Sequence, residues 1–224
     1  VPGLVKAWDA LPAGAHKERL AAPVATLKGW DYRSGEGSVA TSLAMFWGDE
    51  MVKRHGAAAR ADSAALTTYL AGAKVPDADR LAALDAAVGK LAGDFGGWDV
   101  PWGHINRFQR LTGNVNEVYD DKLPSTPIGF ASGNWGSLAS FGSRQRDGTK
   151  RWYGDYGNSF VAVVRFGKDG PEARAVHAGG LNSNPASPHF RDQAERYRSH
   201  DFRPVYFTDA QLQGHVDKTY RPGE

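Results

Sequence analysis

The stretch from Tyr153 to Tyr197, YGDYGNSFVAVVRFGKDGPEARAVHAGGLNSNPASPHFRDQAERY, has the most regular local pattern in the chain. Its near-continuous apolar run at 160–166 predicts a strand that is buried on both faces. The Gly-Lys-Asp-Gly turn that follows predicts a hairpin with a second strand at 173–178. Ser187 and Pro188 predict a helix start, because a serine cap and a first-turn proline both favour one. The last third of the chain therefore reads as a hairpin, a glycine-rich turn and a closing helix.

Amphipathic helical patterns fill the first 96 residues. The clearest one begins at Pro76-Asp77, carries a single apolar stripe and stops at Gly96-Gly97. Three earlier helices are predicted: one within 16–30 that Pro23 should delay to near Ala22, one capped by Thr41 or Ser42, and one capped by Asp62 or Ser63. Residues 1–96 are therefore expected to form a mainly helical layer.

The composition changes near Gly97, where aromatic residues, Gly and Asn become frequent. Strands are predicted at 126–132 and 135–143, separated by the turn dipeptide Gly133-Asn134. A capping box from Thr208 to Gln211 predicts a final helix that ends near Tyr220. Helices followed by antiparallel strands indicate the α+β class. We expect residues 1–224 to be a single fragment, with strands, a hairpin and closing helices over 97–224.

Composition excludes several classes of protein. The chain has no Cys, so disulfides, thiolate metal sites and cysteine nucleophiles are absent. The net charge of +2 comes from 27 scattered basic and 25 acidic residues, which leaves no basic footprint for nucleic acid. No apolar run approaches the roughly 20 residues that span a bilayer. Neither nucleic acid nor a membrane is expected as a partner.

One serine sequence comes close to a nucleophile motif. Gly157-Asn158-Ser159-Phe160-Val161 lacks the final Gly of the G-x-S-x-G elbow and leads into a strand, whereas an elbow lies between a strand and a helix. Asn158 and Ser159 are therefore interpreted as residues that satisfy backbone groups at the start of the strand. Gly179-Gly180 resembles an anion-binding turn only loosely, and turn geometry is the favoured interpretation.

The seven histidines contain no H-E-x-x-H motif. His177 and His189 are the best candidate pair, because the hairpin and the following helix could bring them together, with Asp192 three residues beyond His189. Structural hydrogen bonding is the favoured interpretation, while a metal or a catalytic role remains an alternative.

Two other residue patterns have an alternative functional interpretation. The adjacent carboxylates Asp49-Glu50 and Asp120-Asp121 are expected to face solvent, although a glycosidase pair stays open. The tryptophans at 98, 102, 135 and 152 could form a sugar-binding platform, but core packing is favoured because aliphatic residues are modest in number.

The motif order resembles the carboxy-terminal end of the β subunit in the penicillin acylase family. The order includes the hairpin, AVHAGG, PASPHFRDQ, a helix, the strand FRPVYF and a final helix, and its specific part is HAGG followed by NPASPHFRDQ up to Gln193. LKGWDYRSGEGSVATSLAMFWGDEM and PWGHINRFQRL are similar to upstream segments of the family. One departure is Leu181-Asn182, where many relatives have Gln-Ser. The resemblance implies part of an α-β-β-α four-layer sandwich and an amide-hydrolysing acylase.

The resemblance also implies where the chemistry lies. The family uses the amino-terminal Ser of the β subunit, activated by its own α-amino group, with an oxyanion hole from a backbone N–H and an Asn side chain. This chain begins with Val1, and its motifs align after those residues. No catalytic residue is therefore expected here, and the weak candidates are those already named: Asn158, Ser159, His177, His189 and Asp192.

Partners and location are implied in the same way. The expected partners are the remainder of the β subunit and the α subunit of the same precursor, and the expected substrate is a small acyl amide, in the periplasm or outside the cell. No cofactor or metal is expected in this chain, although a structural calcium elsewhere in the enzyme is possible. A carbohydrate-binding module and a metal hydrolase built on His177, His189 and Asp192 remain as alternatives.

Overall fold

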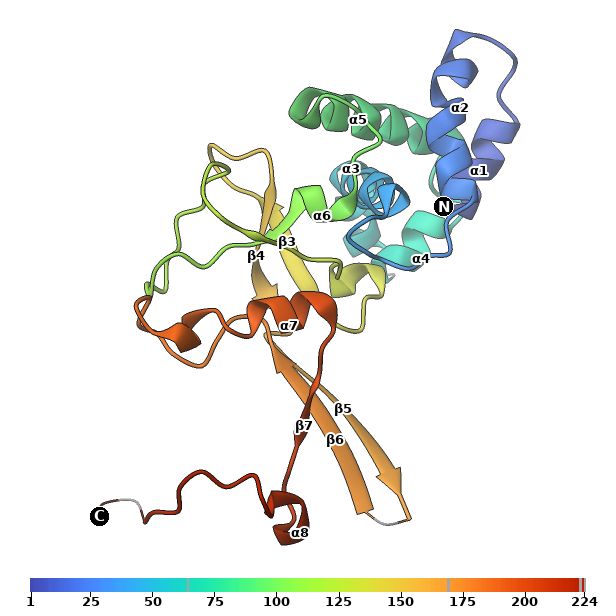
Figure 1. The fold of residues 1–224 in the computed structure, drawn as a ribbon. Coiled ribbons are helices and arrows are strands. Elements are labelled where there is room, and N and C mark those ends of the chain that lie inside the picture. The colour runs from blue at the N-terminus through green and yellow to red at the C-terminus, as the bar shows by residue number, and fades with distance from the viewer. Residues whose placement is uncertain (64, 169, 222, 224) are drawn as a thin grey trace. The chain divides into compact units, whose positions relative to one another are not determined.

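The computed structural model describes residues 1–63, 65–168, 170–221 and 223. The chain divides into two compact units, one formed by 1–109 with 116–157, the other by 110–115 with 158–224. The fold is α+β, as predicted: helices dominate up to Phe95 and the strands follow (Figure 1). The boundary between the units falls after Gly157, whereas the change from helices to strands occurs near residue 97. The prediction of a single fragment remains a prediction.

Helices make up the first part of unit 1. They are α1 (Pro2–Asp9), α2 (Ala15–Lys28), α3 (Val39–Ala61), α4 (Leu66–Ala71), α5 (Asp77–Phe95) and α6 (Trp102–Ile105). Helix α3 lies beside α2, α4 and α5 (Figure 1). Leu20, Leu43, Leu84 and Leu91 are fully buried between them. Burial of these apolar faces is the main source of stability for such a layer.

Helix α5 has the predicted bounds, with Pro76 as N-cap and Gly96 in the left-handed region at φ 84°. Glycine tolerates this conformation without strain, which explains the stop. The predicted delay of α2 to Ala22 is wrong, because α2 begins at Ala15 and continues through Pro23. Pro23 is buried with Leu20 and Val24, and this packing outweighs the hydrogen bond that proline removes.

Two predicted caps are also wrong. Helix α3 is capped by Ser38, whose Oγ accepts a hydrogen bond from the Thr41 N–H at 3.0 Å, while Thr41 and Ser42 are buried inside the helix. Asp62 ends α3 instead of starting the next helix, and Ser63 takes a positive φ of 54°. Helix α4 therefore starts only at Leu66.

The sheet of unit 1 has the strand order β2-β1-β4-β3. Its strands are β1 (Asn106–Phe108), β2 (Thr126–Pro127), β3 (Phe141–Gln145) and β4 (Trp152–Gly157). The β1–β2 and β3–β4 pairs are antiparallel, whereas β1 and β4 run parallel. The two strands predicted over 126–143 are shorter than expected, and a 3₁₀ turn, η1 (Gly133–Trp135), lies between them.

Unit 2 contains an antiparallel sheet in the order β5-β6-β7. The predicted hairpin is present as β5 (Phe160–Gly167) and β6 (Gly170–His177), and β7 (Arg203–Val205) pairs with β6. The predicted burial of β5 is wrong for this chain, because Val163 is 62% and Phe166 85% exposed. Strand β5 is an edge strand, and within the described part of the chain no strand pairs with its outer side.

The helical part of unit 2 is shorter than predicted. Ser187 accepts a hydrogen bond from the His189 N–H, as a cap should, but the element it starts is the 3₁₀ turn η2 (Pro188–Phe190), followed by α7 (Ala194–Ser199). The predicted capping box of Thr208 and Gln211 is confirmed, although α8 (Asp209–Leu212) ends well before Tyr220. Gly214 follows with φ 81°, which breaks the helix.

Candidate functional site

Asn158 and Ser159 both accept hydrogen bonds within unit 2 through their main-chain carbonyls. The Asn158 carbonyl accepts a hydrogen bond from the buried Tyr197 hydroxyl at 3.0 Å, and the Ser159 carbonyl accepts one from the Ala178 N–H at 2.8 Å. Among the described residues, no hydrogen bond joins the Ser159 hydroxyl to a histidine. Both of these bonds use main-chain carbonyls, so the interpretation that Asn158 and Ser159 satisfy backbone groups at the strand start stays a prediction.

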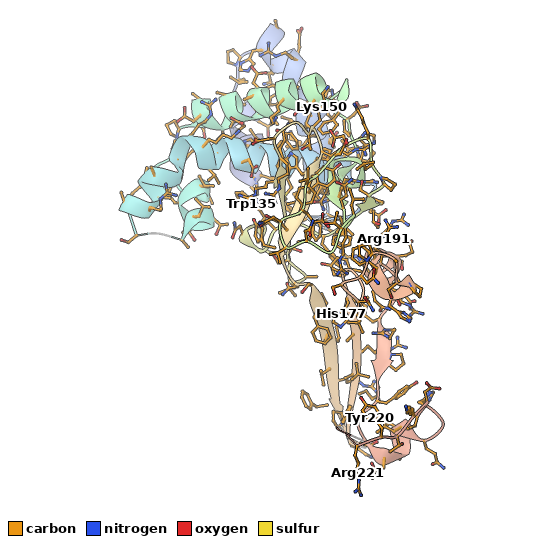
Figure 2. All side chains as sticks on the ribbon, turned by 90° about the vertical axis from the view of Figure 1, so that its left-hand side faces the viewer. Trp135, Lys150, His177, Arg191, Tyr220 and Arg221 are labelled. Carbon is orange, nitrogen blue, oxygen red and sulfur yellow. The ribbon has the colours of Figure 1, made fainter. Side chains whose placement is uncertain are left out.

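The histidine cluster is only partly assembled. His189 Nδ1 lies 2.9 Å from Asp192 Oδ2 on an exposed surface, and this hydrogen bond lowers the pKa of Asp192. His177 ends β6 (Figure 2) and instead contacts the Phe160 ring, with centroids 5.1 Å apart. No group of three His, Asp or Glu residues within the described ranges is arranged to hold a metal ion.

The glycine-rich loop of unit 2 is held by Arg110, a residue that sequence reasoning did not single out. Arg110 Nη1 donates to the carbonyl oxygens of Phe190 at 2.7 Å and Gly180 at 3.3 Å, and its guanidinium lies 4.2 Å from the Phe190 ring centroid. Its Nη2 donates to the Asn182 carbonyl at 3.2 Å. A planar guanidinium can satisfy several carbonyls at once, so Arg110 fixes the HAGG and PHF segments together.

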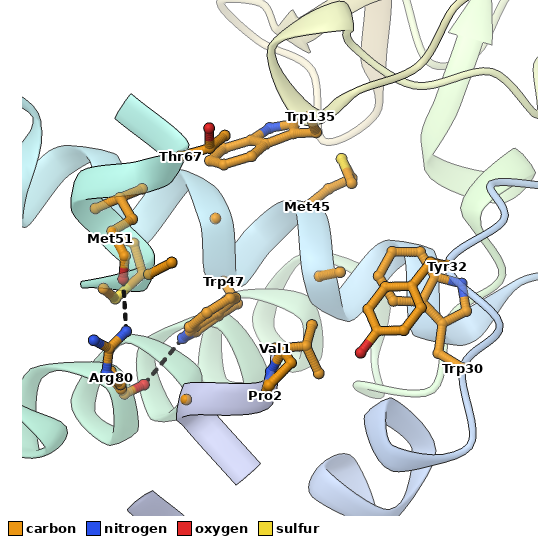
Figure 3. Close-up of a pocket in the computed structure, with 15 residues that line it drawn as sticks. Val1, Pro2, Trp30, Tyr32, Met45, Trp47, Met51, Thr67, Arg80 and Trp135 are labelled. Atoms are coloured by element: carbon orange, nitrogen blue, oxygen red, sulfur yellow. Dashed lines mark hydrogen bonds between the residues drawn. The ribbon is translucent and has the colours of Figure 1, made fainter. Parts of the chain in front are cut away.

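Unit 1 contains a candidate binding site, an apolar cavity of about 370 Å³ between α1, α3, α4 and η1 (Figure 3). Its walls are aromatic and thioether side chains: Trp30, Tyr32, Met45, Trp47, Met51 and Trp135. This volume is within the range of small-molecule pockets. Such walls favour an apolar group and offer little polar specificity.

Arg80 places a buried charge at the wall of this cavity. Its Nη1 donates to the Leu70 carbonyl at 2.6 Å and its Nη2 to Gly72 at 2.8 Å, while its own carbonyl accepts from Trp47 Nε1 at 3.0 Å (Figure 3). These bonds fasten the α4–α5 connection to α5, and they place Trp47 in the wall. Arg80 is therefore a structural residue of the cavity.

Asp49 and Asp121 lie in surroundings that differ from the predicted ones. Asp49 was expected to face solvent, but it lines a second cavity, and burial raises its pKa to about 6. Asp121 is also not a free surface carboxylate: it accepts hydrogen bonds from the Tyr153 hydroxyl at 2.9 Å and the Lys150 N–H at 2.7 Å.

The tryptophans do not form a sugar-binding platform. Trp102 and Trp152 are buried, and their rings meet edge to face with centroids 5.8 Å apart. Trp98 and Trp135 are partly buried and pack against the same core. The favoured interpretation, core packing, accounts for all of them.

Comparison with known proteins defines the class. The penicillin amidase family model matches residues 2–214, which is nearly the whole chain, so this chain belongs to the penicillin amidase family. The predicted family resemblance is confirmed.

Individual relatives match shorter segments. The acyl-homoserine lactone acylase PvdQ of Pseudomonas fluorescens is 41% identical over 56 residues, covering 25% of this chain and 7% of that protein. The PvdQ of Pseudomonas syringae pv. tomato is 35% identical over 65 residues, covering 29% and 8%. A thermostable penicillin G acylase from Alcaligenes faecalis aligns with 98% of this chain and 45% of its own, at 16% identity and a TM-score of 0.44. The matched segments are thus a small part of the curated relatives.

Proposed function

We propose that this chain is the carboxy-terminal part of the β chain of an amide hydrolase that removes an acyl group from an amine-bearing core. The observation that carries the proposal is the family match over residues 2–214. The two curated relatives named above are acyl-homoserine lactone acylases, so an acyl-homoserine lactone is the first candidate substrate. A β-lactam with an acyl side chain and a lipopeptide are the others.

The chain's own role in this proposal is to complete the scaffold. The described residues offer no assembled nucleophile and base: Ser159 is engaged through its carbonyl, and His189 and Asp192 form an exposed pair. The nucleophile, its activating amine and the oxyanion-hole groups would come from another segment of the enzyme.

The proposed partners are the remainder of the β subunit and an α subunit from the same precursor, in the periplasm or outside the cell. The edge strand β5 supports this proposal, because Phe160, Val163, Val164 and Phe166 are between 46% and 85% exposed. An apolar edge strand of this kind pairs readily with another strand. Within the described residues, no helix combines the length and the apolarity needed to cross a membrane.

Hydrolysis assays test the proposal. The full-length coding sequence should yield a protein that releases the amine from at least one of an acyl-homoserine lactone, penicillin G and a lipopeptide. The 224-residue chain expressed alone should release none. Amide hydrolysis by the isolated chain, or failure of the full-length protein on all three substrates, would contradict the proposal. Loss of activity with a chelator would favour the metal-hydrolase alternative.

A further inference from the structure

The apolar cavity of about 370 Å³ in unit 1 gathers side chains that are rare in this chain. Both methionines, Met45 and Met51, line it. Three of the seven tryptophans, Trp30, Trp47 and Trp135, line it as well. Protein interiors seldom contain voids much larger than a water molecule, so core packing alone does not account for a space of this size. Methionine and aromatic side chains form adaptable binding surfaces, and their concentration here points to an apolar ligand.

The polar groups of the longest side chains in this wall already have partners. Trp30 Nε1 donates to the Arg33 carbonyl at 2.9 Å. Trp47 Nε1 donates to the Arg80 carbonyl at 3.0 Å, and the Arg80 guanidinium donates to main-chain carbonyls within residues 70–75. No carboxylate lines the cavity among the residues that the structure describes. The desolvation of a charged ligand would therefore not be compensated, which favours an uncharged one.

An aromatic pair lies where the cavity reaches solvent. Tyr32 lines the cavity and is 61% exposed, and its ring centroid lies 5.2 Å from that of Trp30. The backbone of Tyr32 has a φ of 62°, in the left-handed region that a bulky residue rarely adopts. Backbone strain of this kind is frequent where a side chain is held against a ligand. Tyr32 is thus placed, at a cost in backbone energy, as an aromatic surface at the mouth.

Two indole rings and the volume define the shape of the ligand. Trp135 lies against α3 because residue 48 is Gly48, where an added Cβ would come within 2.8 Å of the indole. Figure 3 shows Trp135 above the space and Trp47 below it. Ring–ring contacts with these indoles, and sulfur–aromatic contacts with Met45, favour a flat aromatic guest over an alkyl one. A cavity of about 150 Å³ holds benzene, so one of about 370 Å³ has room for two fused rings.

We propose that this cavity binds an uncharged, planar aromatic compound of two fused rings, between Trp47 and Trp135 and with Tyr32 at the mouth. The inference does not rest on the proposed function. Calorimetric titration of the protein purified from its full-length coding sequence tests it, with 2-naphthol and its saturated counterpart decahydro-2-naphthol as probes. We expect saturable binding of 2-naphthol at pH 7 and binding of the saturated compound that is about fivefold weaker or more. Equal or tighter binding of the saturated compound would overturn the proposal, as would no saturable binding of 2-naphthol.

A matched pair of variants locates the binding. Ala71 and Ala73 are both exposed, but only Ala71 lines the described cavity. Ala71→Phe should weaken 2-naphthol binding about tenfold or more, because the added ring occupies the space of the ligand. Ala73→Phe should leave the affinity within about twofold. The same affinity in the two variants would place the binding elsewhere in the protein and contradict the assignment.

A third variant tests the mouth. Tyr32→Gly removes the ring and also relieves the backbone strain, since glycine adopts a positive φ freely. We expect 2-naphthol to bind about fivefold more weakly, while the denaturant midpoint does not fall, so the loss of binding cannot come from a loss of folding. An unchanged affinity would show that the Tyr32 ring is not part of the site. If the Ala71 variant does not fold, this variant and the two probes still decide.

Discussion

At the scale of the residue, Gly180 illustrates what sequence reasoning could and could not supply. The Gly-Gly pair indicated a turn, and the backbone bends at Ala178 and Gly179. The reason for the glycine is long-range, because a Cβ at position 180 would collide with the His189 carbonyl oxygen and lie 2.7 Å from the Phe190 carbonyl carbon. The sequence analysis named Asp49 and Trp152 separately, because they lie about a hundred residues apart and only the folded chain brings them to one cavity.

Substituting Gly180 by Ala should therefore destabilise the protein by about 1–3 kcal/mol, because the atoms it meets belong to the backbone and cannot move aside. Gly89→Ala is the matched control, since Gly89 is exposed on α5 and an added Cβ meets nothing within 4 Å. That change should stabilise by up to about 1 kcal/mol through helix propensity. Denaturant unfolding measures both, and a similar effect in the two variants would refute the close approach.

Tyr153 should make the unfolding free energy of the protein decrease as the pH rises from 10 to 12. Burial, together with the hydrogen bond to Asp121, raises its pKa to about 12, above the usual value near 10. The unfolded chain then loses this proton before the folded chain does. The stabilisation from the protonated phenol is complete below pH 10 and is lost as the pH rises to 12. The advantage of the unaltered protein over Tyr153→Phe in unfolding free energy should shrink between pH 10 and 12. A pH-independent difference would contradict this.

At the scale of the element, local signals predicted most helices and the hairpin, and failed where packing decides. The apolar stripe and the glycine stop predicted both ends of α5. The capping box predicted the start of α8. Pro23 led to a wrong start for α2, because the burial of its ring keeps α2 continuous and no local sequence pattern shows that burial. The α3 cap was misplaced because Ser38, Thr41 and Ser42 all have capping side chains, and only their positions in the fold distinguish them.

The two serines of α3 make a direct comparison. Ser38→Ala removes the bond from the Thr41 N–H and should lower the unfolding free energy by about 1 kcal/mol. Ser42→Ala removes a buried hydroxyl that has no hydrogen-bond partner among the described residues, so it should be neutral or slightly stabilising. Unfolding curves of the two variants give the test. A larger loss of unfolding free energy in Ser42→Ala than in Ser38→Ala would show that Ser38 is not the residue that caps α3.

At the scale of the whole molecule, the exposed strand β5 is the main departure from the sequence expectation. Its apolar run predicted burial on both faces, yet Val163 and Phe166 are largely exposed in this chain. In the proposed assembly, other segments of the enzyme would cover β5, and its apolar run would then be buried as the sequence predicts. Sequence reasoning could identify the apolar strand, but one chain cannot supply what covers it.

Charge placed on β5 should therefore block assembly. Val163→Lys should sharply reduce the yield of assembled acylase from the full-length coding sequence, because a lysine would have to be buried. Ala92→Lys, an exposed change on helix α5, should leave the yield unaltered. Gel filtration with activity measurement compares the two, and normal assembly of the Val163 variant would show that β5 stays exposed.

The central claim is that this chain is one part of a penicillin-amidase-type hydrolase whose nucleophile lies on another segment. The most direct test is to measure the intact mass and the amino-terminal residue of every polypeptide that co-purifies with the chain. We expect a polypeptide beginning with Ser, produced from the same precursor as this chain and present in equal amount. A homogeneous, active preparation in which no polypeptide begins with Ser would contradict it.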